Sequence, residues 1–325
     1  MSAPLLDIRA LDLGFEMFEG QSRVLRQVAL TVRAGERVAL VGESGCGKSV
    51  LLRAILGLLD RRKRRLNGEI RFEGNDLLRM RESGLRAVRG GRISMIFQDP
   101  SSSLNPVFTI GAQLSEVMLR HGTAKTVSAA LRLARDALRL VAIDDPDRVL
   151  ASYPFQLSGG MNQRVMITMA LINRPHLVLA DEPGTALDVT VQEQTLRLMR
   201  RLTTEIGAAV LLVTHNLGVV REFAQRVYVM YAGAIVEHAP VEALFASPRH
   251  PYTAALLAAV PRLDGRGLPR PIAGTVPNFL HPPSGCRFRP RCAHAQAACE
   301  SVPPMLAVGR DHDVACVLHR TKVAA

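Results

Sequence analysis

The chain has 325 residues, 48% of them hydrophobic, with four tyrosines and no tryptophan. This length accommodates one large domain and a smaller one, and no apolar run approaches the roughly 18–20 residues of a membrane helix. The net charge of +12 is compatible with nucleotide, an anionic membrane surface or nucleic acid, but so few aromatic residues argue against a stacking platform for single strands.

The first sixty residues predict antiparallel strands, then a buried strand that runs into a glycine loop. Apolar and polar residues alternate over 11–15 and 24–32, as in strands with one buried face. Arg37–Val41 reads as the buried strand, and Val50–Leu59 as a buried helix. Residues 1–10 lack the basic-then-apolar order of a secretory signal, so we expect a cytosolic protein.

A basic run, Arg61–Arg65, follows this helix. We interpret it first as a solvated loop, with a lipid head-group contact or a nucleic-acid patch as alternatives.

Further along, predicted strands alternate with helices. The strands are Ile93–Phe97, Leu177–Ala180 and Val210–Val213, with a hairpin of Val227–Tyr231 and Ala234–Glu237. Helical periodicity marks Thr126–Val141, within a helical stretch to Asn173, and Val189–Ile206. This order predicts an α/β fold with a mostly parallel sheet, an antiparallel β lobe and a helical subdomain over about residues 100–175.

The composition changes after about Pro240, where proline and arginine become frequent. We therefore expect one domain over 1–240 and a small, loop-rich C-terminal extension over 241–325.

Gly42–Ser49 has the sequence Gly-Glu-Ser-Gly-Cys-Gly-Lys-Ser, between a predicted strand and a predicted helix. Its glycines let successive N–H groups point into one concavity that can hold phosphates. Lys48 is expected to reach the β- and γ-phosphates, and the Ser49 hydroxyl to ligate Mg²⁺.

Asp181 and Glu182 end another apolar strand. An aspartate there can hold Mg²⁺ through water, and the adjacent glutamate can orient or deprotonate an attacking water. Alone, the pair would be read as a solvated strand end; beside a phosphate loop it is read as catalytic.

Residues 157–164 read Leu-Ser-Gly-Gly-Met-Asn-Gln-Arg. Ser158 is suited to cap a helix, and Gly159 and Gly160 leave backbone N–H groups open to an anion. No lysine follows them, so this segment predicts half of a phosphate site that a partner completes.

These motifs together resemble those of ATP-binding-cassette (ABC) ATPases, in the order of that family. The resemblance implies a P-loop NTPase core and a catalytic set of Lys48, Gln98, Glu182 and His215. It implies nucleotide contacts from Phe15 (or Phe18), Gly42, Ser44, Gly45, Cys46, Gly47, Lys48, Ser49, Gln98 and Asp181. Mg²⁺ would be held by Ser49, Gln98 and Asp181. Ser158, Gly159, Gly160 and Gln163 would face a partner's nucleotide, and Asp188 would lie in the D-loop.

Three positions depart from the family pattern. Cys46 stands where serine is usual, Asn162 where arginine is more frequent, and Gly184 where threonine is usual. We expect binding and hydrolysis to survive all three. A thiol at a helix N-terminus beside lysine is also expected to have a lowered pKa.

The C-terminal extension resembles that of oligopeptide/dipeptide importer ATPases, through Arg249-His-Pro-Tyr-Thr253 and the segment 285–292, Gly-Cys-Arg-Phe-Arg-Pro-Arg-Cys. Four cysteines lie there in a C-x5-C-x6-C-x16-C pattern: Cys286, Cys292, Cys299 and Cys316. Four thiolates can hold a [4Fe–4S] cluster or Zn²⁺. The resemblance favours the cluster, with zinc or no metal as alternatives.

We therefore expect the ATPase subunit of an ABC importer for peptides or related solutes, peripheral at the cytoplasmic face of the inner membrane. Its implied partners are a related second ATPase subunit, two permease subunits coupled through the Gln98 region, and an extracytoplasmic solute-binding protein. Dipeptides, oligopeptides, nickel complexes, opines and glutathione all remain open as cargo. One alternative is a soluble ABC ATPase that acts on nucleic acid, and a second is a regulatory metal-binding module. The leading interpretation expects no nucleic-acid partner.

Overall fold

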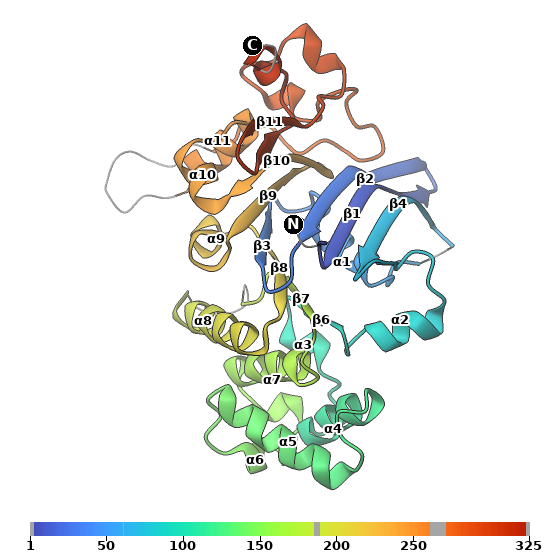
Figure 1. Cartoon of the computed structure of the whole chain (residues 1–325), viewed down its shortest axis with the longest axis vertical. Coiled ribbons are helices and arrows are strands. Elements are labelled where there is room, and N and C mark those ends of the chain that lie inside the picture. Colours follow the sequence, from blue (N-terminus) through green and yellow to red (C-terminus); the bar gives the residue numbers. More distant parts are fainter. Residues whose placement is uncertain (1–2, 61, 185–188, 261–270, 323–325) are drawn as a thin grey trace. The chain divides into compact units, whose positions relative to one another are not determined.

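The computed structural model describes residues 3–60, 62–184, 189–260 and 271–322 (Figure 1). The chain divides into two compact units. Unit 1 comprises Met1–Val32, Arg37–Leu78 and Val213–Ala325, and unit 2 comprises Arg33–Glu36 and Arg79–Leu212. None of the helices in these described stretches has the length and apolar character needed to cross a membrane.

Unit 1 contains an antiparallel sheet in the order β2-β1-β4-β5. Its strands are β1 (Leu6–Met17), β2 (Gly20–Val32), β4 (Arg64–Phe72) and β5 (Asn75–Asp76). The predicted antiparallel lobe is thus confirmed, and β1 and β2 pair from Leu6↔Val32 to Met17↔Gly20.

The prediction of a solvated loop at 61–65 was wrong for its last two residues. Arg64 and Arg65 open β4 and pair with Phe15 and Gly14 of β1. A strand can begin with these charged residues because their long side chains still reach solvent at the edge of the sheet. There Arg65 forms an ion pair with Glu16 at 2.7 Å.

A second run of strands in unit 1 has the order β11-β12-β10-β9-β3. Their bounds are β3 (Arg37–Val41), β9 (Arg226–Tyr231), β10 (Ala234–Pro240), β11 (Leu306–Gly309) and β12 (His312–Val314). β3 and β9 are parallel, whereas β9, β10, β12 and β11 pair antiparallel in turn. The predicted hairpin is confirmed, but the sequence did not predict β11 and β12.

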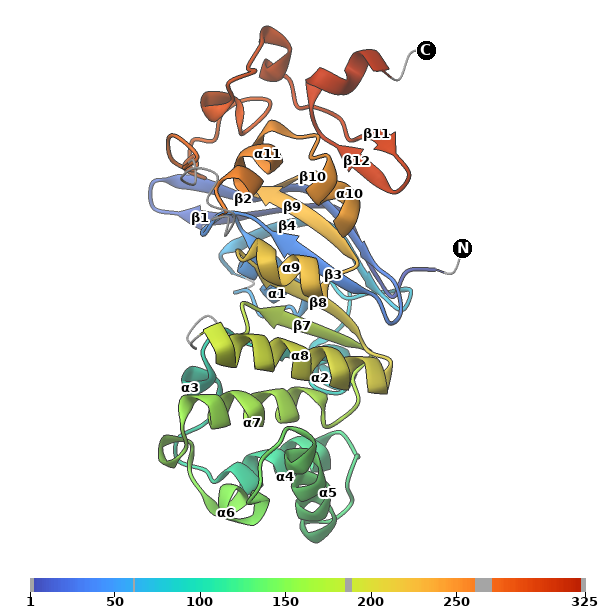
Figure 2. The same cartoon turned by 90° about the vertical axis from the view of Figure 1, so that its left-hand side faces the viewer.

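The helices of unit 1 are α1 (Lys48–Ile55), α9 (Leu217–Phe223), α10 (Val241–Ala246) and α11 (Pro251–Ala258). Short 3-10 turns at Arg289–Arg291, Ala297–Glu300 and Val317–Lys322 follow in the C-terminal segment. Figures 1 and 2 show α9, α10 and α11 beside β9 and β10. The rings of Tyr231, Tyr252 and Phe288 pack with centroids 4.6–5.3 Å apart, which joins α11 and the C-terminal segment to the core.

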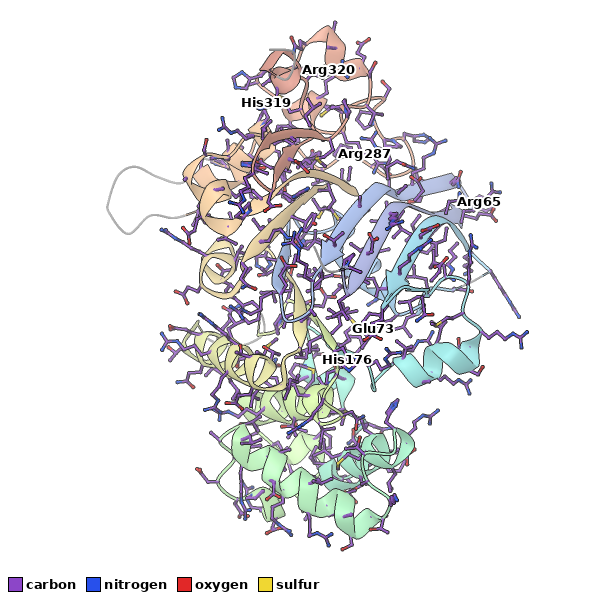
Figure 3. The ribbon with its side chains drawn as sticks, in the orientation of Figure 1. Arg65, Glu73, His176, Arg287, His319 and Arg320 are labelled. Carbon is purple, nitrogen blue, oxygen red and sulfur yellow. The ribbon has the colours of Figure 1, made fainter. Side chains whose placement is uncertain are left out.

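The C-terminal segment also contacts β2. Arg23 N–H donates to Phe279 O at 2.8 Å, and Arg26 Nη1 donates to Gly285 O at 2.7 Å. Arg287, labelled in Figure 3, donates to Ala232 O and to Arg23 O, and burial lowers its pKa to about 10. The extension is therefore fastened to the antiparallel lobe by arginines from both sides.

Unit 2 contains the strands β6 (Ile93–Ile96), β7 (Leu177–Asp181) and most of β8 (Ala209–Thr214), in the order β8-β7-β6. β6 and β7 are parallel, as predicted. Its helices are α2 (Glu82–Val88), α3 (Pro100–Ser103), α4 (Ile110–Arg120), α5 (Val127–Leu140), α6 (Pro146–Ala151), α7 (Gly159–Leu171) and α8 (Val189–Ile206).

Four helices of unit 2, α4, α5, α6 and α7, begin where the sequence supplies caps. The side chains of Thr109, Thr126, Asp145 and Ser158 each accept a hydrogen bond from a backbone N–H in the first turn. In Figure 2, α7 lies between α8 and the group formed by α4, α5 and α6. The helical character predicted up to residue 173 is confirmed.

Candidate functional site

The glycine loop leaves β3 after Val41 and enters α1 at Lys48, as the sequence predicts. Gly47 caps α1 with φ of 105°, a left-handed conformation that favours glycine. A Cβ on Gly42 would lie 2.2 Å from Met230 O, so only glycine fits against β9. Ser44 and Gly45 are exposed at the tip of the loop.

Lys48 is folded over this loop and is 5% exposed. Its Nζ donates to Gly42 O at 2.8 Å and to Glu43 O at 3.0 Å. Ser49 follows as the second residue of α1 and is half-buried. The ammonium and the helix N-terminus therefore give the loop positive potential, which suits phosphate.

The prediction for the Cys46 thiol was wrong. Cys46 is fully buried, and burial raises its pKa; the nearby Lys48 ammonium opposes this shift without overcoming it. The sequence reveals the helix N-terminus and the lysine, but it does not reveal how completely the thiol is removed from water.

Three other candidate residues lie in unit 1. Phe15 is half-buried in β1, whereas Phe18 is fully exposed in the turn that follows. His215 is exposed directly after β8, in a turn where Asn216 N–H donates to Thr214 Oγ1 at 3.0 Å. Asn216 in turn caps α9, so both neighbours of His215 are fixed by hydrogen bonds.

Unit 2 carries Asp181 and Glu182 at the end of β7, where the sequence predicted them. Asp181 is buried, and Glu182 is half-buried with φ of 46°. A left-handed glutamate costs about 1–3 kcal/mol, and such residues concentrate at functional sites. Gly184 also has positive φ, at 103°. Asp188 lies outside the described residues.

The segment after Leu157 forms the helix start that the sequence predicted. Ser158 Oγ accepts from Met161 N at 3.3 Å, and Gly159 and Gly160 open α7. Asn162 is buried and donates to Pro154 O at 3.0 Å, so its amide stabilises the approach to the helix. Gln163, the next residue, is also buried.

A pocket lies beside this helix start and is lined by Ser158 and Gly160. Its lining also includes Arg148, Arg164 and the acidic pair Asp144 and Asp145. Arg164 Nη1 donates to Val141 O at 2.6 Å and to Ala142 O at 3.0 Å, which holds its guanidinium at the pocket wall. Two arginines and two aspartates thus line the pocket beside a glycine-rich helix start that has no lysine.

Gln98 is exposed two residues beyond β6, beside the exposed Phe97. Elsewhere in unit 2 a second exposed apolar group is formed by Val107, Phe108 and the stacked rings of Tyr153 and Phe155, 5.6 Å apart. Ile110 N–H donates to Ser152 O at 2.9 Å, which brings the two halves of that group together.

The four cysteines of the C-terminal segment line a single small pocket. Cys299 and Cys316 are buried, Cys286 and Cys292 are half-buried, and all are free thiols. Burial raises the pKa of Cys316, and the charges of the other three thiols raise it further. Across the described residues, no three His, Cys, Asp or Glu side chains are arranged to hold a metal ion. The donor set suits a thiolate-bound group, although the coordinating geometry itself is not formed.

Sequence reasoning did not single out Glu43 or Arg291. Both lie within motifs of the sequence, but nothing in the sequence indicates that the two side chains meet, because 248 positions separate them.

Two family matches cover much of the chain. The family described as ABC transporter matches residues 25–185, and the family described as oligopeptide/dipeptide transporter, C-terminal region, matches residues 236–299. The first match contains the glycine loop and the Ser158 helix start, and the second contains three of the four clustered cysteines.

Curated relatives align over nearly the whole chain. A probable peptide ABC transporter ATP-binding protein of Sinorhizobium fredii is 49% identical over 96% of this chain and 94% of its own length. A dipeptide transport ATP-binding protein of Bacillus subtilis is 44% identical over 97% and 94%. A probable D,D-dipeptide transport ATP-binding protein of Escherichia coli is 45% identical over 97% and 96%. None of these three is described as acting on nucleic acid.

A solved dimeric ATP-binding cassette in a post-hydrolysis state, bound to ADP and phosphate, matches with a TM-score of 0.65 and 28% identity. The match covers 73% of this chain and 98% of that chain. The core predicted from the motifs is thereby confirmed as an ATP-binding-cassette fold.

Proposed function

The chain belongs to the ATP-binding subunits of oligopeptide/dipeptide ABC transporters and hydrolyses ATP, and from this premise we propose how its residues divide the work. The observation that carries the proposal is the glycine loop Gly42–Ser49, with Lys48 held over its carbonyls at the start of α1. In this proposal Lys48 and the loop N–H groups bind the phosphates, and Ser49, Gln98 and Asp181 hold Mg²⁺. Phe15 stacks on the base.

Glu182 orients or deprotonates the attacking water, and His215 contacts the γ-phosphate. The exposed position of His215 and the left-handed backbone of Glu182 support these roles. General-base help of this kind contributes about 10²–10⁴-fold to the rate.

A second copy of such a cassette completes each site. Ser158, Gly159, Gly160 and Gln163 serve the partner's nucleotide, with Asp188 at the junction. The pocket beside Ser158, whose lining includes Arg148 and Arg164 but no lysine, supports a half-site of this kind. We propose that the partner is a related ATPase subunit paired head to tail.

The exposed apolar residues of unit 2 support a permease contact. Phe97 flanks Gln98, and Val107, Phe108, Tyr153 and Phe155 offer a further uncovered apolar surface. We propose that two permease subunits dock in this region and that an extracytoplasmic solute-binding protein delivers a di- or oligopeptide. The subunit then works peripherally at the cytoplasmic face of the membrane.

The clustered thiols support a structural [4Fe–4S] group. Cys286, Cys292, Cys299 and Cys316 would hold it, because four thiolates are the usual ligands of such clusters and all four line one pocket. A bound cluster would staple a segment that has little core of its own. Iron and sulfide analysis of anaerobically purified protein tests this; zinc, or no metal, in freshly purified protein would contradict it.

The ATPase site itself is tested by Lys48→Ala. We expect the variant to lose nucleotide binding and ATP hydrolysis, while Arg53→Ala, on the exposed side of α1, keeps both. Undiminished hydrolysis by Lys48→Ala would overturn the assignment of the glycine loop.

A further inference from the structure

Glu43, the second residue of the glycine loop, uses all of its polar groups within unit 1. Its N–H donates to the Tyr252 hydroxyl at 3.0 Å, and its carbonyl oxygen accepts from Lys48 Nζ at 3.0 Å. Its carboxylate accepts from Arg291 Nη1, with both oxygens at 3.0 Å. Two of these three partners belong to the chain beyond residue 240.

Arg291 is itself held on every side. Its Nε donates to Ala273 O at 2.7 Å and its Nη2 to Ile272 O at 3.1 Å. Its guanidinium carbon lies 5.7 Å from the centroid of the Tyr231 ring, and the side chain is 5% exposed. An arginine fixed in this way has little conformational freedom when its Nη1 donates to Glu43. The ion pair is therefore a rigid contact and differs from a mobile pair on the surface.

The contact reaches the phosphate-binding groups in two short steps. Arg291 fixes the Glu43 side chain, and the Glu43 carbonyl accepts from the lysine that would meet the phosphates. Tyr252 fixes the N–H of the same residue, and burial raises the pKa of its hydroxyl, which keeps it a neutral hydrogen-bonding group. Two side chains from beyond residue 240 therefore hold Glu43, in the first half of the glycine loop, by its N–H and its carboxylate.

We propose that Arg291 is a positioning residue for ATP, which holds the glycine loop and Lys48 through Glu43. The inference rests on the proposed role of Gly42–Ser49 as the phosphate-binding loop. Arg291 directly precedes Cys292, so this side chain links the cysteine segment to the glycine loop.

The test uses the full chain assembled with its partner subunits and compares four variants: Arg291→Ala, Arg291→Lys, Glu43→Gln and the Arg291→Ala/Glu43→Gln double variant. Binding of a fluorescent ATP analogue and the KM and kcat for ATP are measured for each. Arg289→Ala is the matched control, because Arg289 lies in the same turn but pairs with the exposed Glu300.

A charge-assisted hydrogen bond corresponds to about tenfold or more in an equilibrium constant, so we expect Arg291→Ala to weaken nucleotide binding by about tenfold. KM should rise more than kcat falls, Arg291→Lys should recover part of the loss, and Arg289→Ala should match the wild type. The double variant should be no weaker than the worse single variant, because both remove the same contact.

Unchanged nucleotide affinity in Arg291→Ala, or fully additive losses in the double variant, would overturn the inference. If Arg291→Ala fails to fold, Glu43→Gln tests the same contact from the loop side and keeps both backbone hydrogen bonds. The outcome is separable from that of the site assignment. If Lys48→Ala loses hydrolysis but Arg291→Ala binds nucleotide normally, only the positioning role of Arg291 is refuted. If Lys48→Ala hydrolyses ATP normally, the assignment of the phosphate-binding loop is refuted.

Discussion

The Nε2 atom of His312 lies 2.7 Å from a carboxylate oxygen of Glu237, and both side chains are buried. Glu237 also accepts from Arg249 N at 2.7 Å and His250 N at 2.8 Å. One carboxylate on β10 thus fastens both β12 and the start of α11.

We predict that Glu237→Ala destabilises the protein by about 3–5 kcal/mol. The substitution removes a buried carboxylate and leaves its buried hydrogen-bonding groups without an acceptor. Chemical unfolding followed by circular dichroism measures the change. The control is Asp313→Ala, since Asp313 meets His238 at 2.9 Å with its side chain 32% exposed, and should cost less than about 1 kcal/mol. Equal losses in the two variants would contradict this account of Glu237.

Cys46 should react slowly with alkylating agents in the folded protein. Burial raises the pKa of its thiol, so at pH 8 a smaller fraction is thiolate than for an ordinary cysteine, and the reactive form increases only at higher pH. Mass spectrometry of iodoacetamide-treated protein at pH 7, 8 and 9 measures the labelling. Guanidinium-unfolded protein is the control and should label at the ordinary rate; equally rapid labelling when folded would refute burial of this thiol.

Ser158→Arg should leave ATP binding to its own chain nearly intact and abolish hydrolysis in the assembled pair. The arginine removes the cap of α7, worth about 1 kcal/mol, and fills the space before the helix N-terminus. Equilibrium nucleotide binding and steady-state ATPase activity separate the two effects. Ser128→Arg, at an exposed position in the first turn of α5, should change neither. Loss of ATP binding to the substituted chain would contradict the half-site interpretation.

Glu182 offers a matched pair of substitutions. Glu182→Gln and Glu182→Gly should both slow hydrolysis by about 10²–10⁴-fold while ATP still binds. Only glycine adopts the left-handed backbone at this position without strain. Glu182→Gly should therefore be more stable than Glu182→Gln by about 1 kcal/mol in the free energy of unfolding, and should unfold at a higher temperature. Equal stabilities would show that φ of 46° carries no strain.

Local patterns predicted most of the elements that carry the candidate site. The strand before Gly42, the strand ending at Asp181 and the Ser158 cap all follow from short-range rules: hydrophobic runs, glycine at close approaches and a hydroxyl at a helix start. The roles of these residues in catalysis stay predictions.

What the sequence did not predict depends on distant neighbours. β4 was missed because its first residues are arginines, which pair with β1 only once that strand is folded. The pKa of Cys46 was given the wrong direction because burial is a property of the whole core. The contact of Arg291 with Glu43 has no local signal at all.

The fastening of the C-terminal segment to β2 has a consequence for synthesis. Arg26 and Gly285, which share a hydrogen bond, are separated by 259 positions. At about 5–20 residues per second, a ribosome delivers the second partner on the order of 10–50 s after the first. Until then, the strand made among the earliest lacks contacts that only the last segment provides. A chain truncated late in translation therefore leaves the ribosome with an antiparallel lobe whose strands are all present but which lacks the contacts of the C-terminal segment.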